Sequence, residues 1–222
     1  MHPRSLITSM FALVLVALLA ATATAAPRTP ADLIETQCTS DNRSVTTVLV
    51  AYDTIHGSTA EVAAAIGQQL CDLGFAVDVR LVTHVDDVSA YDAVIIGSAL
   101  YRFNFLRDAL GFIRRNRATL AQLPTALFIV GASMSEDTPE ARDGATRWFV
   151  DPVLERFPEL DPVSVGLFGG AVDFTTNRYT LFERFVLRIL GLVLGFRDSA
   201  DWRDWQAIDQ WAAETGALLI AQ

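Results

Sequence analysis

A short loop rich in hydroxyl groups carries the clearest chemical signal in this sequence. The loop runs from Thr54 to Thr59 and separates an apolar run from a segment with helical spacing. Backbone N–H groups at a helix N-terminus bind phosphate, and the helix dipole favours the negative charge. Gly57 permits close approach of the backbone, and the hydroxyls of Thr54, Ser58 and Thr59 are further donors. The loop therefore predicts a binding site for a phosphate group.

Part of this loop has a second interpretation. Ser58 and Glu61 have the spacing of a capping box, in which the serine accepts from the first helical turn and the glutamate reaches back. A capping box explains neither Thr54 nor Gly57, so phosphate binding is the favoured interpretation. His56 is either another phosphate contact or a solvated loop histidine.

The segments on either side have the patterns needed to position such a loop. Residues 46–52 are apolar and β-branched, which is typical of a short, fully buried strand. From Thr59 onward, apolar residues recur at helical spacing as far as Leu73, and Gly74 follows as a C-terminal cap would. The order strand, loop, helix places residues 54–59 at the carboxyl end of a strand.

The same alternation continues along the chain. Further strands are expected at 76–82, 93–97, 125–130 and 162–168, and further helices at 106–116, from Thr138 onward and at 204–219. Short apolar strands that alternate with helices predict an α/β fold with a doubly wound parallel sheet. The ligand crevice of such a sheet lies at the carboxyl ends of its strands.

The loop and its flanking elements resemble a known family. An aromatic residue, a Ser/Thr loop and a helix resemble the flavodoxin signature, carried here by Tyr52-x-Thr54-x-x-Gly57-x-Thr59-x-x-x-Ala63-x-x-Ile66. At Ala51 a larger apolar residue is usual in that signature. The resemblance implies a flavodoxin-like, five-stranded parallel sheet of order 2-1-3-4-5, with helices on both faces, in a domain spanning residues 45–222. It also implies that the bound phosphate belongs to FMN.

The resemblance further implies where the flavin ring lies. In flavodoxin-like proteins the loops after the third and fourth strands hold the ring, and here these are residues 97–104 and 131–134. The implied cofactor contacts are Ser98, Ala99, Tyr101, Asn104, Gly131, Ala132 and Ser133. Tyr101 is suited to stacking on a ring face, and the hydroxyl and amide groups are suited to the ring edge. Alternatively, Tyr101 or Phe103 covers the edge of the core.

The C-terminal third extends the resemblance. Gly169-Gly170-Ala171, Arg178-Tyr179 and the run 182–190 precede a Trp-containing final helix, a layout similar to that of menaquinone-dependent protoporphyrinogen IX dehydrogenases. The similarity implies an FMN-dependent oxidoreductase that passes electrons from an organic donor, protoporphyrinogen IX in that family, to a membrane quinone. No residue is an obvious catalytic acid or base. An exported electron carrier of the flavodoxin type, a quinone reductase without a porphyrin substrate and a flavin-free binding module stay open as alternatives.

Two further surfaces have more than one interpretation. Residues 181–196 are mostly large and apolar, and are expected either to lie in a membrane interface or to form a packing helix or a dimer interface. Several arginines near the expected ring site suit the paired carboxylates of a porphyrinogen, or form a solvated helix face. They are Arg102, Arg107, Arg114, Arg115 and Arg117.

The N-terminal residues predict export. Residues 1–26 combine Arg4, an apolar run and small residues, which is the pattern of a signal peptide or of a retained membrane anchor. Either one places the domain outside the cytoplasm, in the periplasm or at the outer face of the membrane. Residues 27–44 are expected to be a linker. Cys38 in this linker is placed to form a disulfide with Cys71, although an unpartnered, buried Cys71 is the alternative.

The composition excludes several classes of function. A formal net charge of -9 and a pI near 4.7 oppose an extended contact with nucleic acid. The chain has no lysine, which excludes Schiff-base and lysine-nucleophile chemistry. Its three histidines and two cysteines match no zinc finger or Cys-x-x-Cys spacing, so no metal site is predicted.

Overall fold

The structure, a computed structural model, describes residues 34–39, 46–101, 104–173 and 199–221. The chain divides into two compact units, and the larger one comprises residues 29–172 and 201–222. Of the other unit, residues 1–28 and 173–200, only residues 173, 199 and 200 are described. The predicted export signal, Arg102, Phe103 and the apolar segment 181–196 therefore lie outside the described residues.

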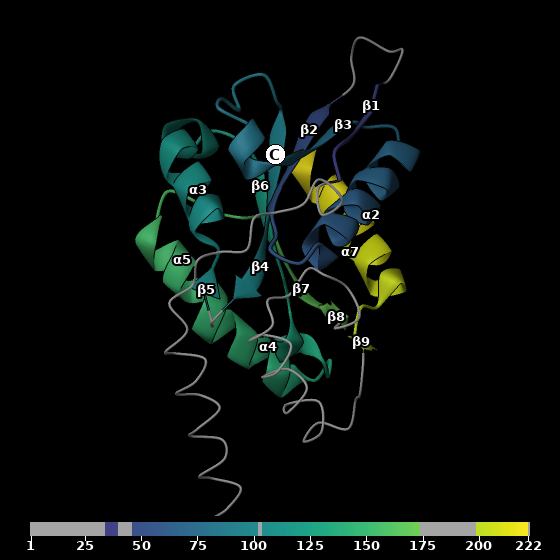
Figure 1. Cartoon of the computed structure of the whole chain (residues 1–222). Helices are drawn as coiled ribbons and strands as arrows, with labels where there is room; N and C mark the ends of the chain where they lie inside the picture. Colours follow the sequence, from purple (N-terminus) through teal and green to yellow (C-terminus); the bar gives the residue numbers. More distant parts are fainter. Residues whose placement is uncertain (1–33, 40–45, 102–103, 174–198, 222) are drawn as a thin grey trace, which may run out of the picture. The chain divides into compact units, whose positions relative to one another are not determined.

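A mainly parallel sheet forms the centre of the larger unit (Figure 1). In spatial order its strands are β1 (Thr36–Cys38), β3 (Ala76–Leu81), β2 (Thr47–Asp53), β4 (Ala93–Tyr101), β6 (Thr125–Gly131) and β7 (Ser164–Gly169). Along this order every neighbouring pair is parallel except β1 with β3. The five parallel strands, numbered along the chain, have the order 2-1-3-4-5, so the predicted doubly wound fold is confirmed.

Helices cover both faces of this sheet. Figure 1 shows α2 (Ser58–Asp72) and α7 (Trp205–Leu219) on one face, and α3 (Arg107–Leu120) and α5 (Asp151–Arg156) on the other. The apolar side chains form two clusters, one on each face of the strands, since successive residues of a strand point to opposite sides. Among the described helices, none combines the length and the apolar character that a membrane crossing requires.

Helix starts follow the capping residues. Thr138 precedes α4 (Pro139–Ala145), and its hydroxyl accepts a hydrogen bond from the N–H of Ala141 at 3.2 Å. Asp204 precedes α7 in the same way and accepts from the N–H of Ala207 at 3.0 Å. Both predicted helix starts are therefore confirmed, and each cap satisfies a backbone donor that the helix leaves without a partner.

Several short elements accompany the long helices and strands. They are the 3-10 turns η2 (Val82–His84) and η3 (Ala132–Met134), the strand β5 (Asn104–Phe105), and the π-helical turn η4 (Thr146–Val150) between α4 and α5. β5 folds back on the end of β4 as an antiparallel hairpin. β8 (Ala171–Asp173) and β9 (Ser199–Asp201) pair as a separate two-stranded sheet.

The strand β1 lies within residues 27–44, where the sequence predicted a linker. Thr36, Gln37 and Cys38 pair antiparallel with β3 at the edge of the sheet. Cys38 forms a disulfide with Cys71 of α2, with a Cα–Cα distance of 6.3 Å, so the predicted pairing is confirmed. The sequence pattern did not predict this strand because three half-polar residues at a sheet edge have no periodicity of their own.

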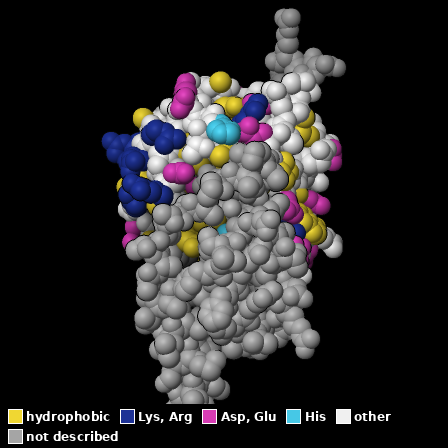
Figure 2. Space-filling model, viewed as in Figure 1, with side chains coloured by type: hydrophobic (Ala, Val, Ile, Leu, Met, Phe, Trp, Pro, Cys, Tyr) yellow, Lys and Arg dark blue, Asp and Glu magenta, His cyan; other side chains and the backbone are white. Residues whose placement is uncertain are grey.

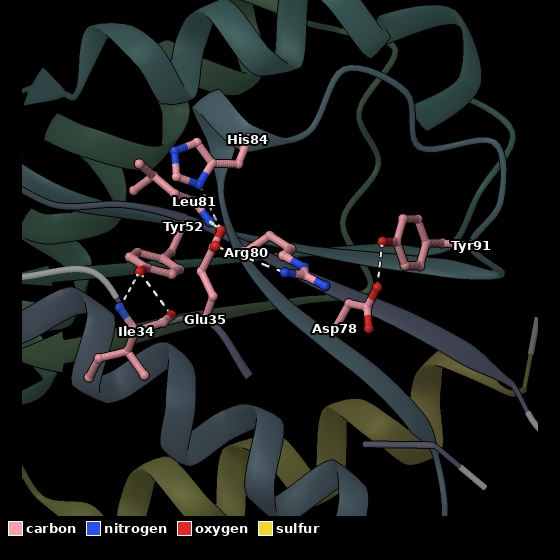
Figure 3. A network of polar contacts seen from close by, with 8 residues as sticks. All are labelled: Ile34, Glu35, Tyr52, Asp78, Arg80, Leu81, His84 and Tyr91. Carbon is pink, nitrogen blue, oxygen red and sulfur yellow. Dashed lines mark hydrogen bonds and ion pairs between the residues drawn. The ribbon is translucent and has the colours of Figure 1, made fainter. Parts of the chain in front are cut away.

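Polar contacts hold the residues just before β1 (Figure 3). The Tyr52 hydroxyl accepts from the N–H of Ile34 at 2.8 Å and donates to the carbonyl of the same residue at 2.9 Å. The Glu35 carboxylate accepts from the N–H of Leu81 at 3.1 Å and lies 3.0 Å from Nδ1 of His84. The Tyr52 side chain of β2, the Leu81 N–H at the end of β3 and the His84 side chain of η2 thus fix the chain where it enters the sheet.

Candidate functional site

The loop between β2 and α2 has the geometry of an anion site. Gly57 is the N-cap of α2 and has φ 92° and ψ -21°, the left-handed conformation that glycine adopts without strain. The Gly57 N–H donates to the hydroxyl of Thr54 at 3.0 Å, which closes the loop. Among the described residues no side chain caps α2, and the N–H groups of a helix's first turn are the ones that need an acceptor outside the helix.

The capping-box interpretation of this loop is wrong. Ser58 lies inside the first turn of α2 and not at its N-cap. The carboxylate of Glu61 does not reach back to the loop, because it pairs with Arg203, 2.5 Å away. The hydroxyl groups and the open helix terminus are therefore available for a ligand.

Two hydroxyls of the loop are fully buried. Thr54 and Thr59 each have 0% exposure, whereas Ser58 and His56 are half-buried. The Thr59 hydroxyl has no hydrogen-bond partner among the described residues. The Thr54 hydroxyl accepts from Gly57, which leaves its own O–H to donate. Because a buried hydroxyl without a partner is costly, the Thr59 geometry fits a phosphate oxygen bound at this loop.

A second set of polar groups fixes the start of α3 at the same edge of the sheet. The Ser98 hydroxyl accepts from the N–H of Leu106 at 2.9 Å and donates to the carbonyl of Ala99 at 2.8 Å. The buried carboxylate of Asp53 accepts from the N–H of Ala109 in the first turn of α3 at 3.1 Å. Ser98, predicted to contact the ring edge, is fully buried and uses its hydroxyl within the protein.

The segment predicted as the first ring loop is largely strand. β4 continues through Gly97 as far as Tyr101, which pairs with Asn104 across the hairpin to β5. A Cβ atom at Gly97 would lie 2.0 Å from the Phe128 ring, so this glycine permits close packing and does not end the strand. Ala99 and Tyr101 are half-buried and Asn104 is exposed.

The second predicted ring loop follows β6. Gly131 ends the strand and is buried, whereas Ala132 and Ser133 are exposed on η3. β2, β4 and β6 are adjacent and parallel, so the phosphate loop, the β4–β5 hairpin and η3 all extend from the same carboxyl edge. The predicted phosphate and ring residues are thereby brought to one edge, and their contacts with a cofactor stay a prediction.

Most arginines of α3 lie away from this edge. Arg107 begins the helix at the carboxyl edge, but Arg114, Arg115 and Arg117 lie about 10–15 Å farther along its axis at 1.5 Å per residue. All four are exposed, and Figure 2 shows arginine side chains gathered where Figure 1 places α3. Of these four arginines, the structure leaves Arg107 beside the predicted ring site.

Arg203, which the sequence patterns did not single out, lies beside the first turn of α2. Its guanidinium binds the Asp201 carboxylate through two nitrogens, at 2.8 and 2.6 Å, and the Glu61 carboxylate through a third. It also lies 4.6 Å from the centre of the Trp205 ring. Hydrogen bonds from Arg203 lower the pKa of Asp201, and the pKa of Arg203 is raised mainly by Asp201 and then by Glu61. Sequence patterns carry little information on this ion pair, because Arg203 and Glu61 are 142 positions apart.

The chain is similar to several known proteins. The flavodoxin domain family matches residues 49–194 of the chain. Protoporphyrinogen IX dehydrogenase (quinone) of Escherichia coli K12 is 22% identical over 179 residues, covering 77% of this chain and 94% of that protein. A flavodoxin from the domain Archaea is 17% identical with a TM-score of 0.47, covering 78% of this chain and 99% of its own. Flavodoxin 1 from Bacillus cereus is 12% identical with a TM-score of 0.47, covering 80% and 99%.

The family match and the observed topology lead to one assignment. The match includes most of β2, the loop after it, β4 and β6, which are the elements that bring the predicted site together. A flavodoxin domain implies a flavin cofactor, FMN, by family. Because residues 49–194 make up more than half of the 222 residues, the chain belongs to the flavodoxin domain family.

Proposed function

We propose that this protein is an FMN-dependent oxidoreductase that passes electrons from an organic donor, a porphyrinogen, to a quinone. The observation that carries the flavin assignment is the loop from Thr54 to Thr59, where a left-handed Gly57 and a buried, unpartnered hydroxyl meet at a helix start. The relative that is named a quinone-linked protoporphyrinogen IX dehydrogenase supports the choice of donor and acceptor.

The described residues would divide the work between binding and positioning. The first-turn N–H groups of α2, with the hydroxyls of Thr54 and Thr59, would hold the phosphate. Tyr101 and Ser133 stand on the two segments that flank the expected ring position. Bound FMN would supply the redox chemistry, in which an electron pair with its protons leaves the donor and converts a quinone to a hydroquinone.

The proposal extends to the compartment. Residues 1–26 have the pattern of an export signal or an anchor, so we propose a location outside the cytoplasm, in the periplasm or on the membrane. The disulfide between Cys38 and Cys71 supports this location, because disulfides persist in oxidising compartments and are rare in the cytosol.

The direct test uses the chain from Pro27 onward, reconstituted with FMN. We expect a yellow protein whose flavin absorbance is bleached by protoporphyrinogen IX without oxygen and restored by a menaquinone analogue. A colourless protein after reconstitution would contradict the flavin assignment. A yellow protein that neither reagent affects would support FMN binding and contradict the proposed donor and acceptor.

A second candidate function is an electron carrier of the flavodoxin type. The net charge of -9 favours it, because an acidic surface steers docking to basic protein partners. Such a carrier would exchange electrons with a protein reductase but would be inert to porphyrinogen and quinone. The same reconstituted sample therefore separates the two functions.

A further inference from the structure

Arg203 is a shielded cation next to the candidate phosphate site. Its side chain is 9% exposed, although Glu61 and Asp201, the carboxylates that it binds, are 41% and 49% exposed. The flat guanidinium also stacks on Trp205 at the start of α7. Arg203 is thus held in place from three sides, by α2, by β9 and by α7.

The partner on α2 explains why this cation matters. Glu61 lies one helical turn after Gly57, since its N–H donates to the Gly57 carbonyl at 3.2 Å. A turn amounts to about 5–6 Å along the axis, so the Glu61 carboxylate is a negative charge close to any phosphate bound at the helix start. Two like charges at this range repel each other unless a cation compensates one of them.

We propose that Arg203 is a positioning residue that acts through Glu61 and makes this site selective for a phosphorylated flavin over riboflavin. The inference rests on the proposed FMN function. Arg203 turns the Glu61 carboxylate away from the loop and offsets its charge, so that the first turn of α2 presents its N–H groups to a dianion. Without the guanidinium, the Glu61 carboxylate would stand uncompensated beside the phosphate.

The test measures the affinity of the full chain for FMN and for riboflavin by quenching of flavin fluorescence. For Arg203→Met we expect FMN to bind about three- to tenfold more weakly and riboflavin to bind as before, because riboflavin carries no phosphate. Arg203→Lys keeps the charge and should retain most of the FMN affinity. The loss in Arg203→Met should shrink at 1 M salt, where the Debye length falls to about 3 Å.

Removal of Glu61 as well gives the sharpest readout. In Glu61→Gln/Arg203→Met both the carboxylate charge and its compensating cation are absent, so FMN affinity should return to within about twofold of wild type. Arg156→Met is the matched control, because Arg156 also stacks on an aromatic ring, Phe157, at 5.5 Å, but belongs to α5 on the opposite face. This control should leave both affinities unchanged.

The possible outcomes separate the inference from the proposed function. Equal losses of FMN and riboflavin binding in Arg203→Met, or no recovery in the double variant, would show a purely structural role and overturn the inference. Wild-type protein that binds neither flavin would instead contradict the proposed function. If Arg203→Met folds poorly, Arg203→Lys and the double variant provide the test. A ratio of FMN to riboflavin affinity equal to that of wild type in these two variants supports the inference, and a lower ratio overturns it.

Discussion

Thr59 and Thr215 both bury a hydroxyl that has no hydrogen-bond partner among the described residues. A buried polar group without a partner costs about 1–3 kcal/mol, so each position calls for a reason. For Thr59 the reason is its place in the first turn of α2, where a phosphate oxygen would accept its proton. Thr215 lies eleven residues after Asp204, about 16 Å along α7, and therefore far from the N-terminus of its helix.

The first prediction compares these two threonines. Thr59→Val should weaken FMN binding about tenfold or more, because a hydrogen bond to a charged group contributes about 1.5–3 kcal/mol. Riboflavin affinity should stay at the wild-type value. Titration of flavin fluorescence measures both constants, and Thr215→Val is the control that should bind FMN normally. Equal FMN affinity in wild type and Thr59→Val would contradict a contact between the Thr59 hydroxyl and the phosphate.

Tyr91 gives a prediction for pH. Its hydroxyl donates to the Asp78 carboxylate at 2.9 Å, and burial, followed by this bond, raises the tyrosine pKa to about 12. A group whose pKa is higher in the folded protein than its unfolded value near 10 stabilises the fold. This contribution of Tyr91 is fully present below pH 10 and is lost as the pH rises towards 12. We expect Tyr91→Phe to be less stable by roughly 1 kcal/mol at pH 8, a figure discounted for the partial exposure of the ring.

Urea unfolding between pH 8 and pH 11.5 measures this effect. The gap between wild type and Tyr91→Phe should be constant to about pH 9.5 and then narrow, because the wild-type protein alone loses the Tyr91 proton. A gap that widens with pH would have the wrong sign for a donated hydrogen bond. Absorbance of tyrosinate in the folded proteins checks the pKa independently.

At the scale of single residues, sequence patterns predicted local features better than distant pairs. Thr54 and Gly57 were identified because their types and spacing point to one loop, and the structure joins them by a hydrogen bond. Ser98 was assigned to the cofactor, yet its hydroxyl anchors the start of α3, a contact eight residues along the chain. The pairing of Arg203 with Glu61 was missed, because spacing holds no information on two residues 142 positions apart.

At the scale of elements, apolar periodicity predicted the long helices and the five parallel strands. It failed where an element is defined by its neighbour. β5 has two residues and exists because it pairs with the end of β4. The end of β4 was expected at Gly97, but the strand continues because that glycine makes room for the Phe128 ring. A glycine in a strand therefore indicated close packing and not a turn.

The packing of α2 on β3 supplies the third prediction. A Cβ atom at Gly67 would lie 2.4 Å from a methyl carbon of Val79, a branched side chain that cannot easily move away. Gly67→Ala should therefore destabilise the protein by about 1–3 kcal/mol through overpacking. Gly144 in α4 has open space at the corresponding position, so Gly144→Ala should stabilise by up to about 1 kcal/mol.

Thermal or urea unfolding of the two variants tests this packing. Both substitutions add the same methyl group to a helix, so helix propensity alone would stabilise both proteins. Opposite signs of the change in unfolding free energy are the expected result. A stabilised Gly67→Ala would mean that α2 can move away from β3 at little cost.

At the scale of the whole molecule, one covalent link joins the N-terminal edge strand to a helix. The Cys38–Cys71 disulfide closes a loop of 33 residues' separation, which by the chain-entropy account contributes about 3–4 kcal/mol. The free energy of unfolding of Cys38→Ser/Cys71→Ser should be lower than that of the oxidised wild type by that amount, and its urea midpoint should fall accordingly. Reductant should lower the wild-type midpoint to that of the variant and leave the variant itself unchanged.

The oxidation state of the two cysteines in the native host bears on the compartment. Protein isolated from its native host under alkylating conditions should show no free thiol after denaturation, because export would oxidise the pair. Two alkylated cysteines in that sample would place the domain in a reducing compartment and contradict the proposed export. The positions of the two cysteines in the sequence predicted the pairing only as one of two outcomes, since they do not reveal the distance between the residues.

The disulfide also sets the path of mechanical tension. Tension applied to the chain ahead of β1 passes along covalent bonds from Cys38 to Cys71 near the end of α2, because the disulfide connects these two residues directly. The segment between the two cysteines is outside this covalent path, and it contains β2, the loop from Thr54 to Thr59 and most of α2. While the bond is intact, the covalent path of a pull on an N-terminal tether bypasses the segment proposed to hold the phosphate.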